Sequence, residues 1–165
     1  MNELKTATNP ASGMAATMKI TSTAFDDGEN IPRKYTCDGD NVNPPITIEG
    51  VPAETESLVL IVDDPDAPGG TWDHWVVWDI PPITEILENS VPGVQGMNDS
   101  ERQRYSGPCP PAGIHRYFFK VYALDTTLNL DPSSTKPDVE EAMKGHVLAH
   151  GQLVGLYGRG IMRKG

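Results

Sequence analysis

The stretch from Arg116 to Leu124 constrains the fold of this chain more than any other, because the strand that it predicts is apolar on both faces. Successive residues of a strand point to opposite faces. One face then carries Tyr117, Phe119, Val121 and Ala123, and the other carries Phe118, Lys120, Tyr122 and Leu124. A strand of this kind is expected to be central in a sandwich and covered on both sides.

The rest of the sequence is typical of a chain that turns often. It has 165 residues, with 16 glycines, 15 prolines and several short apolar runs. Such a composition indicates a mostly β fold, and the length is that of one domain with a single core. Further strands are predicted at residues 18–24, 45–48, 57–63, 74–80 and 94–97.

Towards the end of the chain the apolar period becomes helical. Thr135 provides a helix cap and Pro137 an early helical proline. Apolar and histidine side chains then recur at three- and four-residue steps. The sequence therefore predicts a helix over residues 137–150, and a short helical turn over residues 83–88.

Acidic and histidine side chains occur at the ends of the predicted strands. Asp64 and Asp66 follow an apolar run, in a bend that the flanking prolines stiffen. His74 begins the returning strand, and His115 stands just before the strand that starts at Arg116. If these strand ends converge, their side chains make a small polar pocket.

Several separated motifs resemble, in the right order, those of the phosphatidylethanolamine-binding protein family, which includes the Raf kinase inhibitor proteins. The motifs are Thr36-Cys37-Asp38-Gly39, Asn43-Pro44-Pro45, Asp64 to Pro68, Gly107 to Tyr117, and Gly145-His146 through Leu153-Val154-Gly155. The match extends from Ile20 to Tyr157 and is best with the bacterial and archaeal branch. The resemblance implies an antiparallel β-sandwich, with a large central sheet and a smaller sheet, plus a C-terminal helix.

The resemblance also implies an anion-binding pocket. By it, the ligand-binding residues are Asp64, Asp66, His74, His115 and Tyr117, with Pro68, Trp72, Gly107 and Pro108 in the pocket wall. One departure follows Asn98-Asp99, where the family usually continues with an aromatic residue and glycine and this chain has Ser100 to Arg104. The loop that leads into the pocket is therefore expected to differ in shape or mobility.

A pocket with two carboxylates attracts an anion only if those carboxylates are occupied. We expect one to accept backbone N–H bonds from the bend, and the other to orient a histidine and stabilise its charged form. The histidines, the tyrosine hydroxyl and loop N–H groups would then face a phosphate. Since a neighbouring carboxylate raises the pKa of a histidine, phosphate affinity is expected to fall as the pH rises through about 6.5 to 8.

The net charge of −10 argues against nucleic-acid partners, whose binding depends on lysine and arginine. It also opposes adsorption to anionic lipid surfaces. A single phosphate or phosphoethanolamine head group is compatible with it, because screening over about 8–10 Å limits what distant carboxylates do.

No stretch approaches the roughly 20 apolar residues that span a bilayer, so no integral membrane segment is predicted. The N-terminus also lacks the apolar core of a signal peptide. Residues 1–17 are predicted to be a flexible leader on a cytoplasmic protein, with the family domain at residues 18–165.

Two further features concern cysteine and metal chemistry. Cys37 and Cys109 are predicted to be free thiols in a cytoplasmic setting, with a structural disulfide as the alternative. His146 and His150 share a face of the predicted helix, but they lack a glutamate partner and a third ligand. Neither a metal nor a cofactor is predicted.

The leading hypothesis is a binding protein that holds a small anion and uses the occupied pocket, or its rim, to engage a kinase or a protease. One alternative is direct serine protease inhibition through a surface loop. Another is a hydrolase or isomerase that uses Asp64 with His74 or His115 as acid and base. The chain has no Gly-x-Ser-x-Gly elbow and no glycine-rich nucleotide loop, which argues against an enzyme. Prokaryotic relatives suggest a homodimer.

Overall fold

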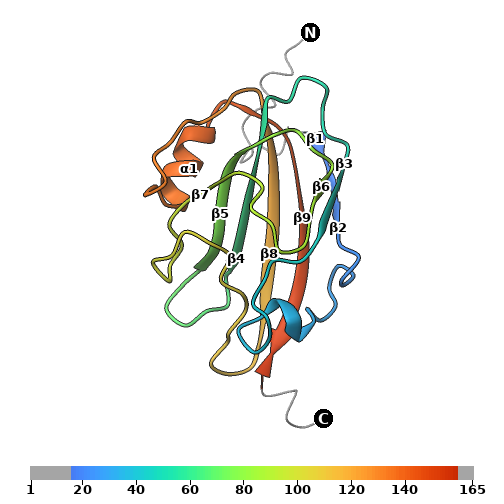
Figure 1. Cartoon of the computed structure of the whole chain (residues 1–165), viewed down its shortest axis with the longest axis vertical. Helices are drawn as coiled ribbons and strands as arrows, with labels where there is room; N and C mark the ends of the chain where they lie inside the picture. Colours follow the sequence, from blue (N-terminus) through green and yellow to red (C-terminus); the bar gives the residue numbers. More distant parts are fainter. Residues whose placement is uncertain (1–15, 160–165) are drawn as a thin grey trace.

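The computed structural model describes residues 16–159, which form two β-sheets and one short α-helix (Figure 1). The elements are β1 (Ala16–Thr17), β2 (Lys19–Thr21), the 3₁₀ helix η3 (Arg33–Tyr35), β3 (Ile46–Glu49), β4 (Ser57–Asp64), β5 (Trp72–Ile80), β6 (Glu85–Ile86), β7 (Val94–Gln95), β8 (Ile114–Leu124), α1 (Lys136–Met143) and β9 (Val147–Gly158). The large sheet has the order β1-β9-β8-β4-β5-β7, and the small sheet has the order β2-β3-β6. The predicted mostly β architecture, with a large sheet, a smaller sheet and a helix, is confirmed.

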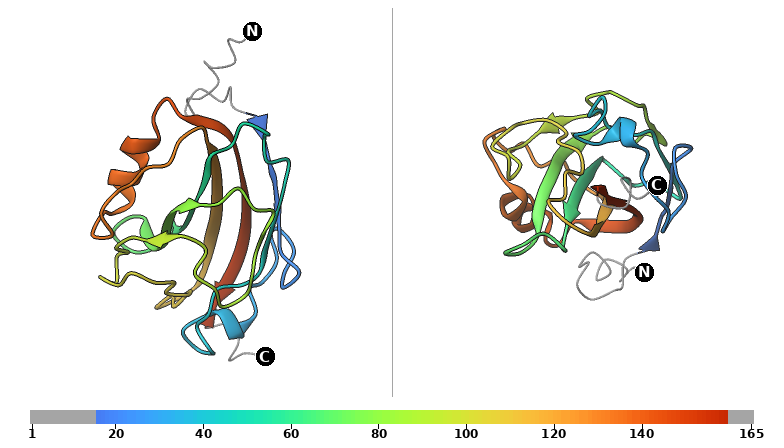
Figure 2. Two further views of the ribbon diagram at one scale, coloured as in Figure 1. Left: turned by 45° about the horizontal axis from the view of Figure 1, so that its top comes forward. Right: turned by 90° about the horizontal axis from the view of Figure 1, so that it is seen from below.

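Strand β4 is buried along its whole length, and the two halves of the core lie on its two faces. Leu58, Leu60 and Val62 belong to a cluster that the small sheet covers. Val59 and Ile61 belong to a second cluster, which includes residues of α1. Figure 2 shows the large sheet with α1 on one side and the small sheet on the other. The alternation of strand side chains therefore divides one apolar run between two layers.

Strand β8 lies between β9 and β4, so its predicted central position is confirmed. Its inner face is buried, with Tyr117 and Phe119 in the core. Its outer face is buried at Leu124 but only half-buried at Phe118 and Lys120. The prediction that both faces are covered is wrong for the start of the strand, because the short α1 packs near β5 at the far end of the sheet.

The predicted helix over residues 137–150 is wrong beyond Met143. The helix starts near the prediction, with a capping box between Thr135 and Asp138. It ends before Gly145, whose φ of +82° is a backbone conformation that favours glycine. The residues that follow form β9, which pairs with β8 in antiparallel register along most of its length.

Two smaller predictions also change. Residues 83–88 do not form a helical turn; they contain β6, which pairs with β3. Residues 16 and 17, assigned to the leader, form β1 alongside β9. The other leader residues lie outside the part that the structure describes.

Cys37 and Cys109 are joined in a disulfide, so the prediction of free thiols is wrong and its alternative holds. The bond connects the segment after η3 to the proline-rich loop before β8. Since disulfides are rare in most cytoplasmic proteins, the cysteines no longer support a cytoplasmic location. Within residues 16–159, no helix is long and apolar enough to cross a membrane.

Candidate functional site

A hollow of about 420 Å³ opens where strand β4 ends and strands β5 and β8 begin. These strand ends meet because β4 runs antiparallel to both of its neighbours. The loops at residues 65–71 and 98–113 complete the wall. The predicted residues that line the hollow are Asp64, Pro68, Trp72, His74, Gly107, His115 and Tyr117.

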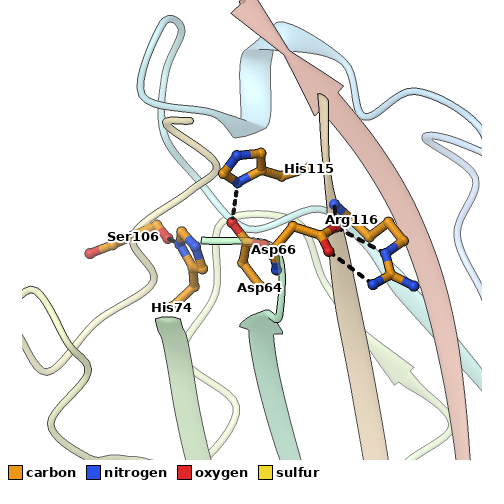
Figure 3. Close-up of polar contacts among 6 residues, drawn as sticks. All are labelled: Asp64, Asp66, His74, Ser106, His115 and Arg116. Atoms are coloured by element: carbon orange, nitrogen blue, oxygen red, sulfur yellow. Dashed lines mark hydrogen bonds and ion pairs between the residues drawn. The ribbon is translucent and has the colours of Figure 1, made fainter. Parts of the chain in front are cut away.

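Asp64 is buried at the end of β4, and both of its oxygens are engaged. Oδ1 accepts the backbone N–H of Asp66 at 2.8 Å, within the proline-containing bend. Oδ2 lies 2.6 Å from Nδ1 of His115, which donates to it (Figure 3). One carboxylate therefore fixes the bend and orients an imidazole, the two tasks that the sequence analysis divided between Asp64 and Asp66.

His74 is held from the opposite side of the hollow. Its Nδ1 lies 2.6 Å from the carbonyl oxygen of Ser106, so Nδ1 carries a proton and Nε2 is left available to a ligand (Figure 3). Burial lowers the pKa of His74 below its ordinary value of 6.5, against the opposing effects of the Ser106 bond and the Asp64 charge. Neighbouring carboxylates do raise the pKa of His74, as expected, but burial outweighs them, so the expected net rise does not hold for this residue.

Tyr117 lines the hollow with a buried side chain. The side chain is fully buried, and within the described chain its hydroxyl forms no hydrogen bond. Its ring packs edge-on against His74, with centroids 5.3 Å apart, and stacks near His115 at 6.3 Å. Burial and the charge of Asp64 raise its pKa, so the hydroxyl keeps its proton and can donate it in a hydrogen bond.

Asp66 and Pro108 do not line the hollow, although the resemblance implied that they belong to the pocket. Asp66 turns towards β8, where its two oxygens accept from Nε and NH2 of Arg116, each at 2.9 Å (Figure 3). These bonds lower the pKa of Asp66 to about 2. Pro108 instead offers its carbonyl oxygen to the backbone N–H of Cys37, at 3.1 Å.

The loop that departs from the family pattern is closed by Asn98. Its Oδ1 accepts the backbone N–H groups of Ser100 and Arg102, and its Nδ2 donates to the carbonyl oxygens of His74 and Arg104. A single amide side chain thus ties the loop to β5. Ser100, the first residue of the departure from the family pattern, is part of the lining.

The lining residues beyond the predicted set are Ala67, Ser100, Ser106, Cys109, Pro110 and Pro111. Ser106 acts through its backbone carbonyl, which any residue type offers, so no sequence signal marks it. Cys109 lines the hollow as half of a disulfide. The motif Gly107 to Tyr117 identified this segment but not these roles.

The side-chain donors in the lining are imidazoles, hydroxyls and the indole of Trp72. Among the described residues that line it there is no lysine or arginine. A neutral imidazole whose Nδ1 carries the proton presents a lone pair at Nε2, and only the protonated ring donates there. The site therefore joins one unpaired hydroxyl to two imidazoles whose Nε2 atoms donate to an anion only in the protonated ring.

The histidines near the end of the chain are apart from this site. Because α1 ends at Met143, His146 and His150 do not share a helix face. His146 pairs with Asp125 at 2.8 Å, and His150 lies in β9 near the ring of Tyr122. Within residues 16–159, no three His, Cys, Asp or Glu side chains form a group that could hold a metal ion.

Comparisons with known proteins agree with this fold. The sequence profile described as phosphatidylethanolamine-binding protein matches residues 21–158. A UPF0098 protein of Methanothermobacter thermautotrophicus is 54% identical over 87% of this chain and 100% of its own length. A UPF0098 protein of Pyrococcus horikoshii is 52% identical over 84% of this chain and 75% of its own length.

Two solved structures have the same fold. The phosphatidylethanolamine-binding protein homologue CT736 of Chlamydia trachomatis matches with a TM-score of 0.84 and 41% identity, over 88% of this chain and 99% of that one. Escherichia coli YbcL, described as a member of the mammalian PEBP family, matches with a TM-score of 0.80 and 32% identity, over 87% of this chain and 99% of that one.

Proposed function

We propose that this chain, which belongs to the phosphatidylethanolamine-binding protein family, is a binding protein that holds a small phosphate-bearing anion in the hollow. The observation that carries the proposal is the buried Tyr117 hydroxyl, which has no partner within the described chain and lies between two imidazoles. An unpaired buried donor costs free energy that a bound acceptor recovers. Phosphate or the phosphoethanolamine head group supplies several such acceptors.

Binding of the anion is coupled to proton uptake. His74 and His115 each use Nδ1 within the protein, so each needs a second proton before Nε2 can donate to the ligand. An anion beside these rings stabilises their charged form. The bound state therefore contains more protons than the free state whenever the free imidazoles are neutral.

The rim of the hollow offers an apolar surface to a protein partner. Trp72 lines the hollow with 41% of its surface exposed, and Ile114, next to His115, is 48% exposed. Exposed apolar side chains beside a ligand site are suited to an interface whose shape depends on the ligand. A kinase or a protease is the class of partner that family membership suggests, and a second copy of the chain is the other.

A second candidate is acid–base catalysis, which the Asp64–His115 pair favours. A buried carboxylate 2.6 Å from Nδ1 of a histidine holds Nε2 ready to take or give a proton. The hydroxyl of Ser106 already accepts from Asn98, at 3.1 Å, and no contact joins it to either imidazole within the described chain. The pair therefore supports acid–base chemistry better than a serine nucleophile.

Isothermal titration with sulfate, inorganic phosphate and O-phosphoethanolamine tests the proposal. We expect one site per chain, and a loss of binding in His115→Gln that the control variant His146→Gln does not share. Flotation with phosphatidylethanolamine vesicles distinguishes a lipid head group from a free anion. Mass spectrometry of the recovered ligand detects turnover, and a serine protease panel tests direct inhibition.

No heat of binding for any of these anions at pH 5.5 would remove the anion site. If the wild-type protein hydrolyses phosphoethanolamine and His115→Gln does not, the chain is an enzyme and the proposal of a binding protein is wrong. Native mass spectrometry in the same buffers reports whether the chain is a monomer or a homodimer.

A further inference from the structure

We propose that the Cys37–Cys109 disulfide is a thiol–disulfide exchange site that opens into the hollow, with Sγ of Cys109 as the atom that a small anionic thiol attacks. The preference for an anionic thiol rests on the proposed anion site. The site of attack rests instead on how the two cysteines are placed.

The two cysteines differ in their access to solvent. Cys109 is exposed and lines the hollow. Cys37 is half-buried in the segment behind it, and its backbone N–H donates to the carbonyl of Pro108. A molecule in the hollow therefore reaches the sulfur of Cys109 first, and access decides which sulfur of a disulfide is attacked.

Arg159 supplies positive charge beside this sulfur. Its Nη1 lies 3.8 Å from Sγ of Cys109, while its Nη2 donates to Asp38 at 3.0 Å and so holds the side chain in place. Cations stabilise thiolates, which are both the attacking and the leaving species of exchange. The structure thus combines an exposed sulfur, a cavity for the attacking molecule and a fixed cation.

The exchange balances with two molecules of thiol. The first thiolate forms a bond to Sγ of Cys109 as the disulfide breaks, and the electron pair leaves on Cys37 as a thiolate. A second thiolate attacks the outer sulfur of this mixed disulfide, and Cys109 leaves as a thiolate beside Arg159. The protein is reduced by two electrons, the two small thiols leave as one disulfide, and the protons that they lose pass to the cysteines through solvent.

Reduction changes the hollow because the same loop carries Ser106 and Cys109. Ser106 holds His74 through its carbonyl, and the loop is otherwise tied to the segment after η3 by the hydrogen bonds of Gly107 with Asn41 and of Cys37 with Pro108. When the disulfide is reduced, the loop that carries Ser106 and Cys109 is expected to be less ordered. Anion binding must then also fix this loop, which costs conformational entropy. Ordering about one residue corresponds to roughly tenfold weaker sulfate binding in the reduced protein.

Three thiols of equal length test which sulfur is attacked and whether an anionic thiol is preferred. They are 2-mercaptoethanesulfonate, 2-mercaptoethanol and cysteamine, which are anionic, neutral and cationic. The oxidised protein is treated with each, quenched with acid and mapped by peptide mass spectrometry, with rates divided by thiolate concentration. We expect the first adduct on Cys109, the anionic thiol to react about tenfold faster than the cationic one, and sulfate to slow it. The net charge of −10 alone would give the opposite order.

Arg159→Gln provides the matched variant, because it removes the cation and leaves both cysteines. We expect it to abolish the preference for the anionic thiol, whereas Lys144→Gln, at the end of α1, keeps that preference. A first adduct on Cys37, or a rate that rises with positive charge on the thiol, overturns the proposal. Sulfate that binds the oxidised protein without slowing exchange overturns it too. Failure of sulfate to bind at all instead removes the proposed anion site, and peptide mapping then judges the exchange site separately.

Discussion

Asp64 uses its two carboxylate oxygens for two tasks: Oδ1 fixes the bend after β4, and Oδ2 orients His115. The proline flanks made the first role predictable, since they fix a local bend. The second role depends on the register of β4 against β8, a distance in space that no local pattern encodes.

The lowered pKa of His74 predicts opposite pH effects on the free and the bound protein. Below pH 6.5 the unfolded chain takes up this proton more readily than the folded one, so the stability of the free protein is complete above pH 6.5 and falls as the pH drops through the folded pKa. Sulfate binding favours the protonated form of His74. The affinity for sulfate should therefore rise by up to about tenfold for each pH unit that the pH falls below 6.5.

Thermal unfolding with and without sulfate, from pH 8 to pH 5, measures both effects at once. Sulfate suits this experiment because its own charge is constant there. His74→Asn should flatten both profiles. A sulfate affinity that is unchanged in wild type below pH 6.5 would show that His74 takes no part.

Tyr117→Phe should separate stability from binding. It removes a buried hydroxyl that has no partner within the described chain, so the free energy of unfolding is expected to rise by about 1 kcal/mol. Anion affinity should fall by about tenfold or more, since a charge-assisted hydrogen bond is lost. Urea unfolding and titration calorimetry measure the two quantities.

Tyr122→Phe is the matched control, because Tyr122 lies on the same strand outside the hollow. Its anion affinity should equal that of wild type. An equal loss of affinity in both variants would mean that the hydroxyl of Tyr117 has no specific role.

At the scale of elements, β9 marks the limit of sequence reasoning. Its inward positions include Gly151 and Gly155, which break the apolar alternation that identifies a strand. Those glycines are required by packing: an added Cβ at Gly151 would overlap the carbonyl oxygen of Met18, and one at Gly155 would meet Ile31. Strands β4, β5 and β8 were predictable because most of their inward positions carry large apolar side chains and none of those positions is a glycine. Gly145 indicated an early end of α1, but the three- and four-residue spacing of apolar and histidine side chains continues beyond it and favoured a longer helix.

Gly151→Ala should therefore destabilise the protein by about 1–3 kcal/mol, because the Met18 carbonyl belongs to the backbone and cannot rotate away. Gln152→Ala, one position along on the exposed face, should change the free energy of unfolding by less than about 0.5 kcal/mol. Urea unfolding of the pair measures the difference. Equal stability of the two variants would contradict the packing argument.

For the whole molecule, the disulfide joins parts of the chain that are 72 residues apart. Closing a loop of that length restricts the unfolded chain, so reduction should lower the free energy of unfolding by about 2–4 kcal/mol. Cys37→Ser combined with Cys109→Ser should give the same decrease, measured by urea unfolding with and without a reductant. Reduced and oxidised proteins of equal stability would show that the bond does not form in solution.

The fold class and the location of the hollow were predictable over the whole molecule because ordered motifs and strand ends identify them. The state of the cysteines was not, because compartment is a poor guide to a distance between two sulfur atoms. For the same reason Arg159 could not be placed beside Cys109: it is remote in sequence and arrives only through the pairing of β9 with β8.

His115 and Arg116 follow one another on β8. Neighbours on a strand face opposite ways, so the strand that delivers an imidazole inward also delivers, at its next residue, a guanidinium that draws Asp66 outward. A count of acids near the mouth overstates the negative potential that an incoming anion meets. Loss of Arg116 would leave the negative charge of that carboxylate uncompensated, and a residue outside the lining of the hollow would then weaken its attraction for an anion.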